Sequence, residues 1–205
     1  MSDLDKLIKH FEKFPGVGIR QAKRFAFHIL TLSNEERNDF VHLVDNVHTS
    51  VRSCLQCQRF FTATHNHNSH TCDICNDESR DKSKLLVVEK DNDIIAIEKS
   101  DVYNGLYFVL GGTVPLLNEA HTNKLRGGAL KVIVNDRMNI LKEIILGFSV
   151  NPDGENTANY VESLLKDNIE ENQLKISLLG RGLSTGSELE YADPDTIKSA
   201  LSNRN

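Results

Sequence analysis

The sequence predicts an α+β multidomain protein with a helical N-terminal part, a cysteine-rich middle and a C-terminal α/β part. Three observations predict this layout. Apolar residues recur at helical spacing through residues 2–51. All of the cysteines fall between Cys54 and Cys75. From Leu85 onward, short apolar runs alternate with amphipathic stretches, a pattern typical of a mostly parallel sheet covered by helices.

Three helices are predicted in the N-terminal part. Residues 2–14 form the first, which Ser2 or Asp3 can cap, and its apolar residues fall at i, i+3, i+4 and i+7: Leu4, Leu7, Ile8 and Phe11. A Phe-Pro-Gly-Val-Gly stretch ends it, and a second helix runs from about Ile19 to Thr31. Ser33 and Glu36 form a capping box that starts the third helix. We expect this helix to direct four apolar side chains inward: Phe40, Val44, Val47 and Val51.

The C-terminal part contains apolar runs predicted to be strands at 85–88, 106–110, 144–150 and 174–179. Helices are predicted at 93–99 and 157–166, and Asp193-Pro-Asp caps a last short helix. Residues 111–142 have no clear pattern, and we assign no elements to them. These segments predict four domains: 1–53 helical, 54–80 cysteine-rich, 81–175 α/β, and 176–205 a C-terminal strand and short helix.

Composition limits the classes of function. The chain has 205 residues, of which 39% are hydrophobic and 26% charged, as in ordinary globular proteins. Its net charge is −5, so any contact with nucleic acid requires a local basic patch. No apolar run reaches the roughly 18 residues that a membrane span needs. The charged N-terminus lacks the apolar core of a signal peptide. We therefore expect a cytoplasmic, nucleoid-associated location and no membrane partner.

The cysteines form two CxxC pairs, Cys54–Cys57 and Cys72–Cys75, with fourteen residues between them. Each CxxC turn directs two thiolates at one point, and two such turns complete a tetrahedron around Zn²⁺. Disulfides are the alternative, which a cytoplasmic location disfavours. Three histidines of the intervening loop, His65, His67 and His70, are expected to be exposed because four thiolates already fill the site. We predict one structural Zn²⁺ per chain.

A second chemical signal lies between the first two helices. Gly16 and Gly18 allow a tight turn, so that N–H groups at the start of the following helix face outward and attract a phosphate oxygen. Arg20, Lys23 and Arg24 follow, and no acidic residue occurs between Glu12 and Glu35. An ordinary helical pair with a solvated basic face is the alternative. We predict that these five residues bind the DNA backbone without reading sequence.

Together with these motifs, three further segments resemble the RecR family in the family's own order. They are 93–116, 143–160 and 180–201, and the resemblance covers nearly the whole chain. It implies a helix-hairpin-helix at 1–53, a four-cysteine zinc finger at 54–80 and a TOPRIM domain at 81–175. RecR proteins are non-enzymatic recombination mediators in DNA repair. They form oligomeric clamps and act with RecO, and in many bacteria RecF, to load recombinase on gapped or single-stranded DNA. The resemblance therefore implies a homo-oligomer, a dimer or tetramer ring.

The resemblance also assigns an acidic cluster, with Glu89 matching the TOPRIM glutamate. Catalytic TOPRIM enzymes carry an Asp-x-Asp pair, but Ser149 and Asn151 occupy those positions here, and Asp153-Gly-Glu155 follows. If Asn151-Pro is instead aligned with the Asn-Pro of the family, Asp153 alone remains. Neither alignment restores the pair. We expect Glu89, Asp153 and Glu155 to contact a partner protein or to bind Mg²⁺ weakly; capping of the 157–166 helix is the alternative.

Other departures and alternatives follow from the same segments. The family commonly has Gly-Leu-Pro-Val-Gly-Gly where this chain has Gly182-Leu-Ser-Thr-Gly-Ser, and the cysteine spacer is longer than usual. The glycine pairs at 111 and 127 lack the spacing of a nucleotide loop, so we predict turns there and no ATPase activity.

A Mg²⁺-dependent TOPRIM nuclease or topoisomerase-like enzyme is one alternative function, which the missing aspartates disfavour. A zinc-ribbon protein adaptor is the other, which the cationic hairpin disfavours.

Overall fold

The computed structural model describes residues 1–62, 70–116, 124–172, 174–180, 182, 186 and 188–202. Contacts divide the chain into two units, Met1–Val51 and Arg52–Asn205. The predicted fold class is confirmed: helices at the N-terminus, a four-cysteine cluster and an α/β part with a parallel sheet. The four predicted domain boundaries stay predictions. None of the helices in the described part of the chain is long and apolar enough to cross a membrane.

The first unit consists of α1 (Asp3–Phe11), α2 (Ile19–Thr31) and α3 (Asn34–Ser50). Ser2 caps α1, and the predicted capping box of Ser33 and Glu36 starts α3. α1 packs on α2 through aromatic rings, with the centroid of Phe11 lying 5.7 Å from that of Phe25. Ala22 and Ala26 of α2 are the buried residues of its packed face.

The expectation for the inward face of α3 is wrong. Phe40, Val44 and Val47 are 45%, 55% and 47% exposed, and α3 buries no residue. The apolar residues do recur at helical spacing, but this spacing predicts only which side chains share a face of the helix and not whether that face is buried. No other element of this unit covers that face. The unit therefore carries a large exposed apolar surface on α2 and α3.

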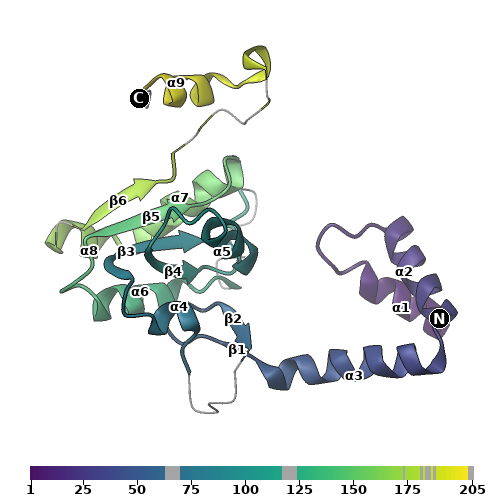
Figure 1. Cartoon of the computed structure of the whole chain (residues 1–205). Helices are drawn as coiled ribbons and strands as arrows, with labels where there is room; N and C mark the ends of the chain where they lie inside the picture. The colour runs from purple at the N-terminus through teal and green to yellow at the C-terminus, as the bar shows by residue number, and fades with distance from the viewer. Residues whose placement is uncertain are drawn as a thin grey trace. The chain divides into compact units, whose positions relative to one another are not determined.

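The second unit begins with a small cysteine-rich segment. It contains a two-stranded sheet of β1 (Val51–Ser53) and β2 (Phe60–Thr62), followed by the short helix α4 (Asp73–Asn76). A four-stranded sheet comes next, formed in the order β4-β3-β5-β6 and parallel throughout (Figure 1). Its strands are β3 (Asp81–Val88), β4 (Gly105–Val109), β5 (Glu143–Gly147) and β6 (Lys175–Leu178).

Both faces of this sheet contribute to the core. Along β3, Leu85 and Val87 join a cluster with residues of α6 (Gly127–Asp136) and α7 (Pro152–Leu164). Leu86 and Val88 join a second cluster with α5 (Asp91–Glu98) and three of the cysteines. A continuous apolar run is expected for a parallel strand buried on both sides. The remaining elements are α8 (Lys166–Asn172), η2 (Leu189–Tyr191) and α9 (Pro194–Ser202).

The short helices α4 and α8 were not predicted, and α6 and α7 differ from the sequence prediction in a way that bears on the site. α6 lies in the stretch to which we assigned no elements, and Gly127 and Gly128 are its first residues, so the turn predicted there is wrong. α7 begins at Pro152 rather than at 157, because the Asn151 side chain accepts a hydrogen bond of 2.8 Å from the Gly154 N–H and Pro152 suits the first turn. The earlier start places Asp153 and Glu155 in the first turn of α7.

Candidate functional site: a metal centre, a basic hairpin and an acidic strand end

The four predicted metal ligands meet in one place. Cys54 and Cys57 lie on a turn between β1 and β2, Cys72 caps α4 and Cys75 lies within it. Their sulfur atoms all lie within 4.8 Å of one another, and the Sγ atoms of Cys57 and Cys72 are 3.6 Å apart. Tetrahedral zinc with bonds of about 2.3 Å separates its sulfur ligands by roughly 3.8 Å. The geometry therefore fits a metal ion bound by four thiolates.

The donor set also limits which metal chemistry is possible. All four cysteines are free of disulfide bonds, and three are fully buried. Hydrogen bonding between the two thiols of the first pair lowers the pKa of Cys54 and raises the pKa of Cys57. His70 is exposed, and His65 and His67 lie outside the described residues. Within the described ranges, the cysteines are the only close group of three or more potential ligands.

The cysteine turn is attached directly to the large sheet. The Val109 N–H of β4 donates a hydrogen bond of 2.8 Å to the Cys57 carbonyl. The Arg126 guanidinium donates to the carbonyls of Gln58 at 2.7 Å and Val109 at 3.3 Å. It also lies 5.5 Å from the centre of the Phe60 ring. Nothing in the sequence pattern pointed to Arg126, because its partners are backbone carbonyls distant along the chain.

The predicted DNA-binding hairpin is a tight turn. Val17 N–H donates to the Phe14 carbonyl at 3.0 Å, and Gly16 has a φ of +74°. Proline followed by glycine with positive φ is the pattern of a type II turn. Nothing lies within 4 Å of the position that a Cβ on Gly16 or Gly18 would take. The hairpin is therefore open to a ligand that approaches its backbone closely.

The start of α2 differs from those of its neighbours. Ser2 and Ser33 accept backbone hydrogen bonds of 3.2 Å at the starts of α1 and α3, whereas Gly18 gives α2 no side-chain cap. α1 and α3 have acidic residues in their first turns, and α2 has none. The three cations of this segment are exposed and make no ion pair with any described residue: Arg20, Lys23 and Arg24. The helix dipole and these cations favour an anion at this end.

The predicted acidic cluster lies where strands β3 and β5 end. Glu89 directly follows β3, is 9% exposed, and accepts a hydrogen bond of 2.7 Å from the Ser149 N–H. Asp153 accepts one of 3.0 Å from the Leu116 N–H. Glu155 is exposed. Gly154 permits this arrangement, because a Cβ there would lie 1.9 Å from the Ser149 carbonyl oxygen. The carboxylates of Glu89 and Asp153 thus each accept a hydrogen bond from a backbone N–H.

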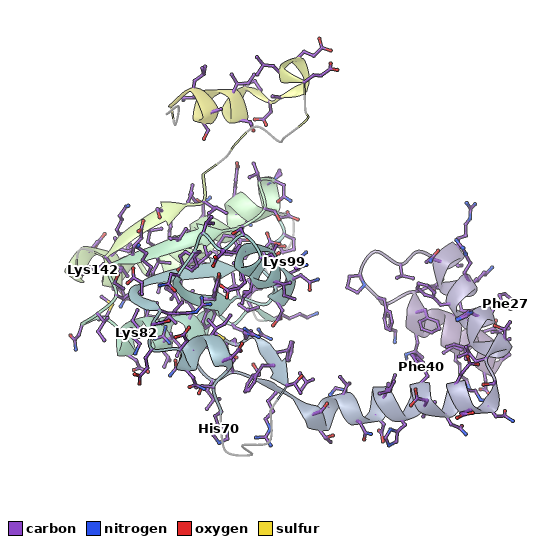
Figure 2. The ribbon with its side chains drawn as sticks, viewed as in Figure 1. Phe27, Phe40, His70, Lys82, Lys99 and Lys142 are labelled. Carbon is purple, nitrogen blue, oxygen red and sulfur yellow. The ribbon has the colours of Figure 1, made fainter. Side chains whose placement is uncertain are left out.

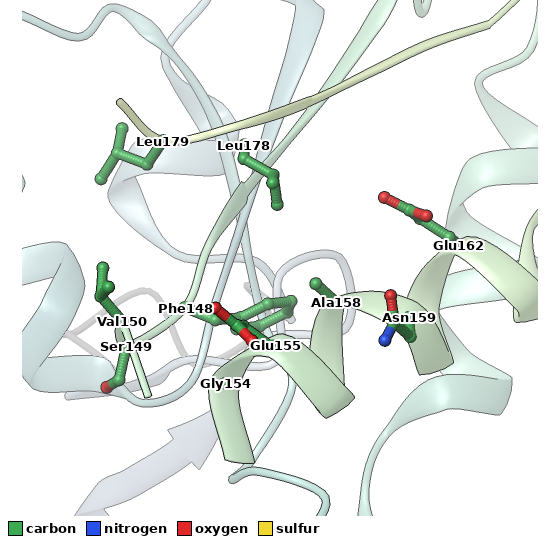
Figure 3. A pocket seen from close by; sticks show the side chains of 10 residues that line it. All are labelled: Phe148, Ser149, Val150, Gly154, Glu155, Ala158, Asn159, Glu162, Leu178 and Leu179. Carbon is green, nitrogen blue, oxygen red and sulfur yellow. The ribbon is translucent and has the colours of Figure 1, made fainter. Parts of the chain in front are cut away.

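A pocket of about 250 Å³ opens beside Glu155. Ser149 and Val150 line it after β5, α7 contributes Glu155, and Leu178 at the end of β6 lines it together with the next residue, Leu179 (Figure 3). Leu178 and Leu179 are 63% and 55% exposed. No local sequence signal indicates this pocket, because it depends on β6 lying next to β5.

Comparison with known proteins gives a match to the helical N-terminal part, to the α/β part and to the C-terminal segment. The model of the RecR helix-hairpin-helix matches residues 4–48, that of the Toprim domain 83–179, and that of the RecR C-terminal region 182–205. "Recombination protein RecR" of Streptococcus mutans serotype c is 37% identical over 199 residues, covering 97% of this chain and 94% of the relative. The proteins of the same name from Streptococcus thermophilus and Bifidobacterium longum are 36% and 34% identical, covering 97% and 98% of this chain and 94% of each relative.

The fold and the site together define a recombination protein that combines a helix-hairpin-helix, a four-cysteine metal-binding cluster and a Toprim domain. The chain belongs to the RecR family.

Proposed function

We propose that this chain is a non-enzymatic DNA-binding mediator of recombination in DNA repair. The observation that carries the proposal is the start of α2, which has no side-chain cap, no acidic residue in its first turn and three exposed cations. Its N–H groups and the turn at Gly16 bind one phosphate oxygen, and Arg20, Lys23 and Arg24 contact neighbouring phosphates. Such contacts bind DNA of any sequence, because they read only the backbone.

The absence of catalysis is part of the proposal. A phosphoryl-transfer site with divalent metal needs several carboxylates around the ion. Ser149 and Asn151 are neutral at the positions where catalytic TOPRIM enzymes carry aspartates. Here the Ser149 N–H donates to Glu89, and the Asn151 side chain caps α7. The Asn151 side chain therefore has a structural role that needs no metal ion, and the neutral Ser149 side chain adds no charge for one.

The metal is proposed to be one structural Zn²⁺ per chain, bound by Cys54, Cys57, Cys72 and Cys75. Four thiolates leave no open coordination position for substrate. Thiolate ligands favour Zn²⁺ over the harder cations Mg²⁺ and Ca²⁺. When bound, the ion would fix the cysteine turn, and the Cys57 carbonyl and Arg126 would connect that turn to the sheet.

Assembly into a dimer or tetramer ring is proposed from the surface of the first unit. Several large apolar side chains of α2 and α3 are more than two-fifths exposed, including Phe27, Leu30, Phe40 and Val44. So many large exposed apolar side chains are typical of a protein interface. A symmetric oligomer also repeats the basic hairpin, which multiplies the phosphate contacts of a chain whose net charge is negative.

The finer role is action as a clamp on gapped or single-stranded DNA, with RecO and possibly RecF as partners in loading recombinase. We propose that the acidic strand end with Glu89, Asp153 and Glu155 is the surface for such a partner or a weak Mg²⁺ site. The pocket beside Glu155 supports a protein partner, because exposed Leu178 and Leu179 supply apolar contacts next to the carboxylates.

A mobility-shift experiment on gapped DNA, with and without Mg²⁺, tests the proposal. The wild-type chain should bind in both conditions and leave the DNA intact. A triple variant, Arg20→Ala/Lys23→Ala/Arg24→Ala, should bind much more weakly. A control variant, Lys6→Ala/Lys9→Ala/Arg37→Ala, removes the same charge from exposed positions outside α2 and should bind nearly as well as wild type. Equal loss in both variants would contradict the role of the hairpin.

A further inference from the structure

Four lysines lie at the amino ends of three adjacent strands. Lys82 and Lys84 belong to the start of β3, Lys142 directly precedes β5, and Lys175 begins β6. The strands are parallel and neighbours in the order β3-β5-β6, so their amino ends meet at one edge of the sheet. The Lys142 N–H donates to the Ser83 carbonyl at 2.8 Å, and the Lys175 N–H donates to the Lys142 carbonyl at 3.1 Å. We call these four residues the amino-edge lysines.

Two of the amino-edge lysines have carboxylate partners and two do not. Lys84 Nζ lies 3.2 Å from Asp81, and Lys175 Nζ lies 2.9 Å from Glu143. Lys82 and Lys142 are exposed, and neither forms an ion pair with any residue in the described ranges. Figure 2 shows both on the same side of the second unit. The edge therefore has an excess of positive charge.

The opposite edge of the same sheet is acidic. Glu89 follows the carboxyl end of β3, and Asp153 and Glu155 lie in the first turn of α7, shortly after the carboxyl end of β5. The amino ends thus carry four lysines against the two carboxylates of Asp81 and Glu143, whereas three further carboxylates lie near the carboxyl ends. In a chain with a net charge of −5, such a concentrated group of cations directs a polyanion to one edge.

We propose that the amino-edge lysines form a second contact surface for the DNA backbone, distinct from the hairpin residues. The inference rests on the proposed DNA-binding function and extends it. Neighbouring strands are about 4.8 Å apart, so β3, β5 and β6 spread these cations over about 10 Å. Each strand of duplex DNA carries one phosphate per 3.4 Å or so of helix axis, so an edge that lies along the axis covers about three of them.

The residue type favours phosphate over an acidic protein segment as the ligand. Lysine supplies a compact charge on a flexible stem, which suits contacts to successive phosphates without sequence readout. Strong protein interfaces depend instead on Trp, Tyr and Arg anchors. None of the four positions carries such an anchor.

The test uses the full-length chain and a Lys82→Gln/Lys142→Gln variant. These two lysines are chosen because their loss breaks no ion pair in the described structure. Binding to a fluorescent single-stranded oligonucleotide and to gapped duplex is measured by anisotropy between 50 and 200 mM salt. Lys90→Gln/Lys99→Gln is the matched control, since both side chains are exposed, form no ion pair with any described residue and lie at the two ends of α5. Figure 2 shows Lys99 far from Lys82 and Lys142.

Loss of two phosphate contacts per chain should reduce the slope of log K against log[salt] by about 1.4 to 1.8. Between 50 and 200 mM salt, the affinity of wild type should then fall by a factor that is roughly ten times larger than the factor for the variant. An equal change of the slope in the control variant would show that only the net charge of the chain matters, and it would overturn the proposal. Unchanged DNA binding together with lost binding of poly-glutamate would assign the edge to an acidic protein instead. If wild type binds no DNA at all, the proposed function itself fails; if only the hairpin variant loses binding, this inference alone fails.

Discussion

The backbone N–H of Val109 in β4 donates a hydrogen bond of 2.8 Å to the carbonyl of Cys57, one of the four clustered cysteines. Cys54, Cys57 and Cys72 belong to the same buried cluster as Val88, Tyr107 and Val109. The candidate metal centre is therefore part of the core of the second unit rather than a separate appendage. Changes in the centre should affect the stability of the sheet, and changes near β4 should affect the centre.

Removal of one metal ligand tests this connection. Cys72→Ser should abolish binding of the metal and either prevent soluble expression or lower the melting temperature of the second unit, because structural zinc contributes folding free energy directly. Elemental analysis of wild type should give about one zinc per chain. His70→Ala is the control, since His70 is exposed and outside the cysteine group, and it should retain the metal. Folded wild-type protein without metal would contradict the assignment.

Arg126 should stabilise the attachment of the cysteine turn. Arg126→Gln removes the charged donors to the carbonyls of Gln58 and Val109, and we expect a loss of roughly 1.5 to 3 kcal/mol in the free energy of unfolding. Arg126→Lys should recover little, because a single ammonium cannot reproduce the planar guanidinium that contacts both carbonyls and the Phe60 ring. Urea denaturation measures both variants against Lys124→Gln, an exposed control close by in the chain. Full recovery by lysine would show that charge alone matters.

The stability of the second unit should fall in acid through Glu98. Burial raises the pKa of Glu98. Hydrogen bonds from Arg80 and Tyr107 lower this pKa by more than burial raises it, so the pKa lies below its usual value. Because the pKa of Glu98 is lower in the folded state, its ionised carboxylate stabilises the fold at pH values above the unfolded pKa of about 4.3. This stabilisation is lost as the pH falls through the folded pKa. Glu98→Gln should cost roughly 1 to 3 kcal/mol near pH 7 and progressively less below pH 4.3 or so.

Denaturation at several pH values checks this expectation. The exposed Glu78→Gln variant serves as the control and should follow wild type at every pH. A difference between Glu98→Gln and wild type that stays constant from pH 7 to about pH 3 would rule out ionisation of Glu98 as the cause.

The apolar surface of α2 and α3 should mediate assembly. Phe27→Asp and Val44→Asp place charge in this surface, where the native side chains are both 55% exposed. We expect wild type to be a dimer or tetramer by light scattering at micromolar concentration, and each variant to dissociate to a smaller species. Val102→Asp is the control, because Val102 is an exposed apolar residue of the second unit, and it should not change the mass. If wild type is a monomer both with and without DNA, the proposed oligomeric clamp is wrong.

The acidic strand end should be dispensable for bare DNA binding. Glu89→Ala and Asp153→Ala should retain the metal and DNA affinity, while weakening a complex with RecO in a pull-down. Neither wild type nor variants should nick plasmid DNA in Mg²⁺ or Mn²⁺, because the site lacks the aspartate pair that would hold two ions. Metal-dependent nicking that disappears in Glu89→Ala would overturn the non-enzymatic assignment.

Local signals allowed the helices of the first unit to be predicted. The bounds of α2 match the prediction, and the capping box of Ser33 and Glu36 is present, because both depend on residues a few positions apart. The buried strand at 85–88 was predicted from its continuous apolar run, and the CxxC spacing predicted the cysteine cluster. The prediction began α7 at 157 and missed its early start, although Asn151-Pro152, a cap followed by a first-turn proline, is a local signal for it.

Long-range features were not predictable in this way. The exposure of Phe40 and Val44 depends on what covers α3, which helical periodicity does not specify. α6 begins with two glycines, which are weak helix formers, and its packing against the sheet outweighs their propensity. The amino-edge lysines and the contacts of Arg126 are brought together only by the strand order.

The salt dependence of DNA binding tests the central claim most directly. The affinity of wild type and of Arg20→Ala/Lys23→Ala/Arg24→Ala for two duplexes of unrelated sequence is measured between 50 and 200 mM salt. Wild type should bind both duplexes equally, and the variant should show a slope of log K against log[salt] that is smaller by about 0.9 for each lost phosphate contact per chain engaged. An unchanged slope, or a strong preference of wild type for one sequence, would contradict backbone binding by the hairpin.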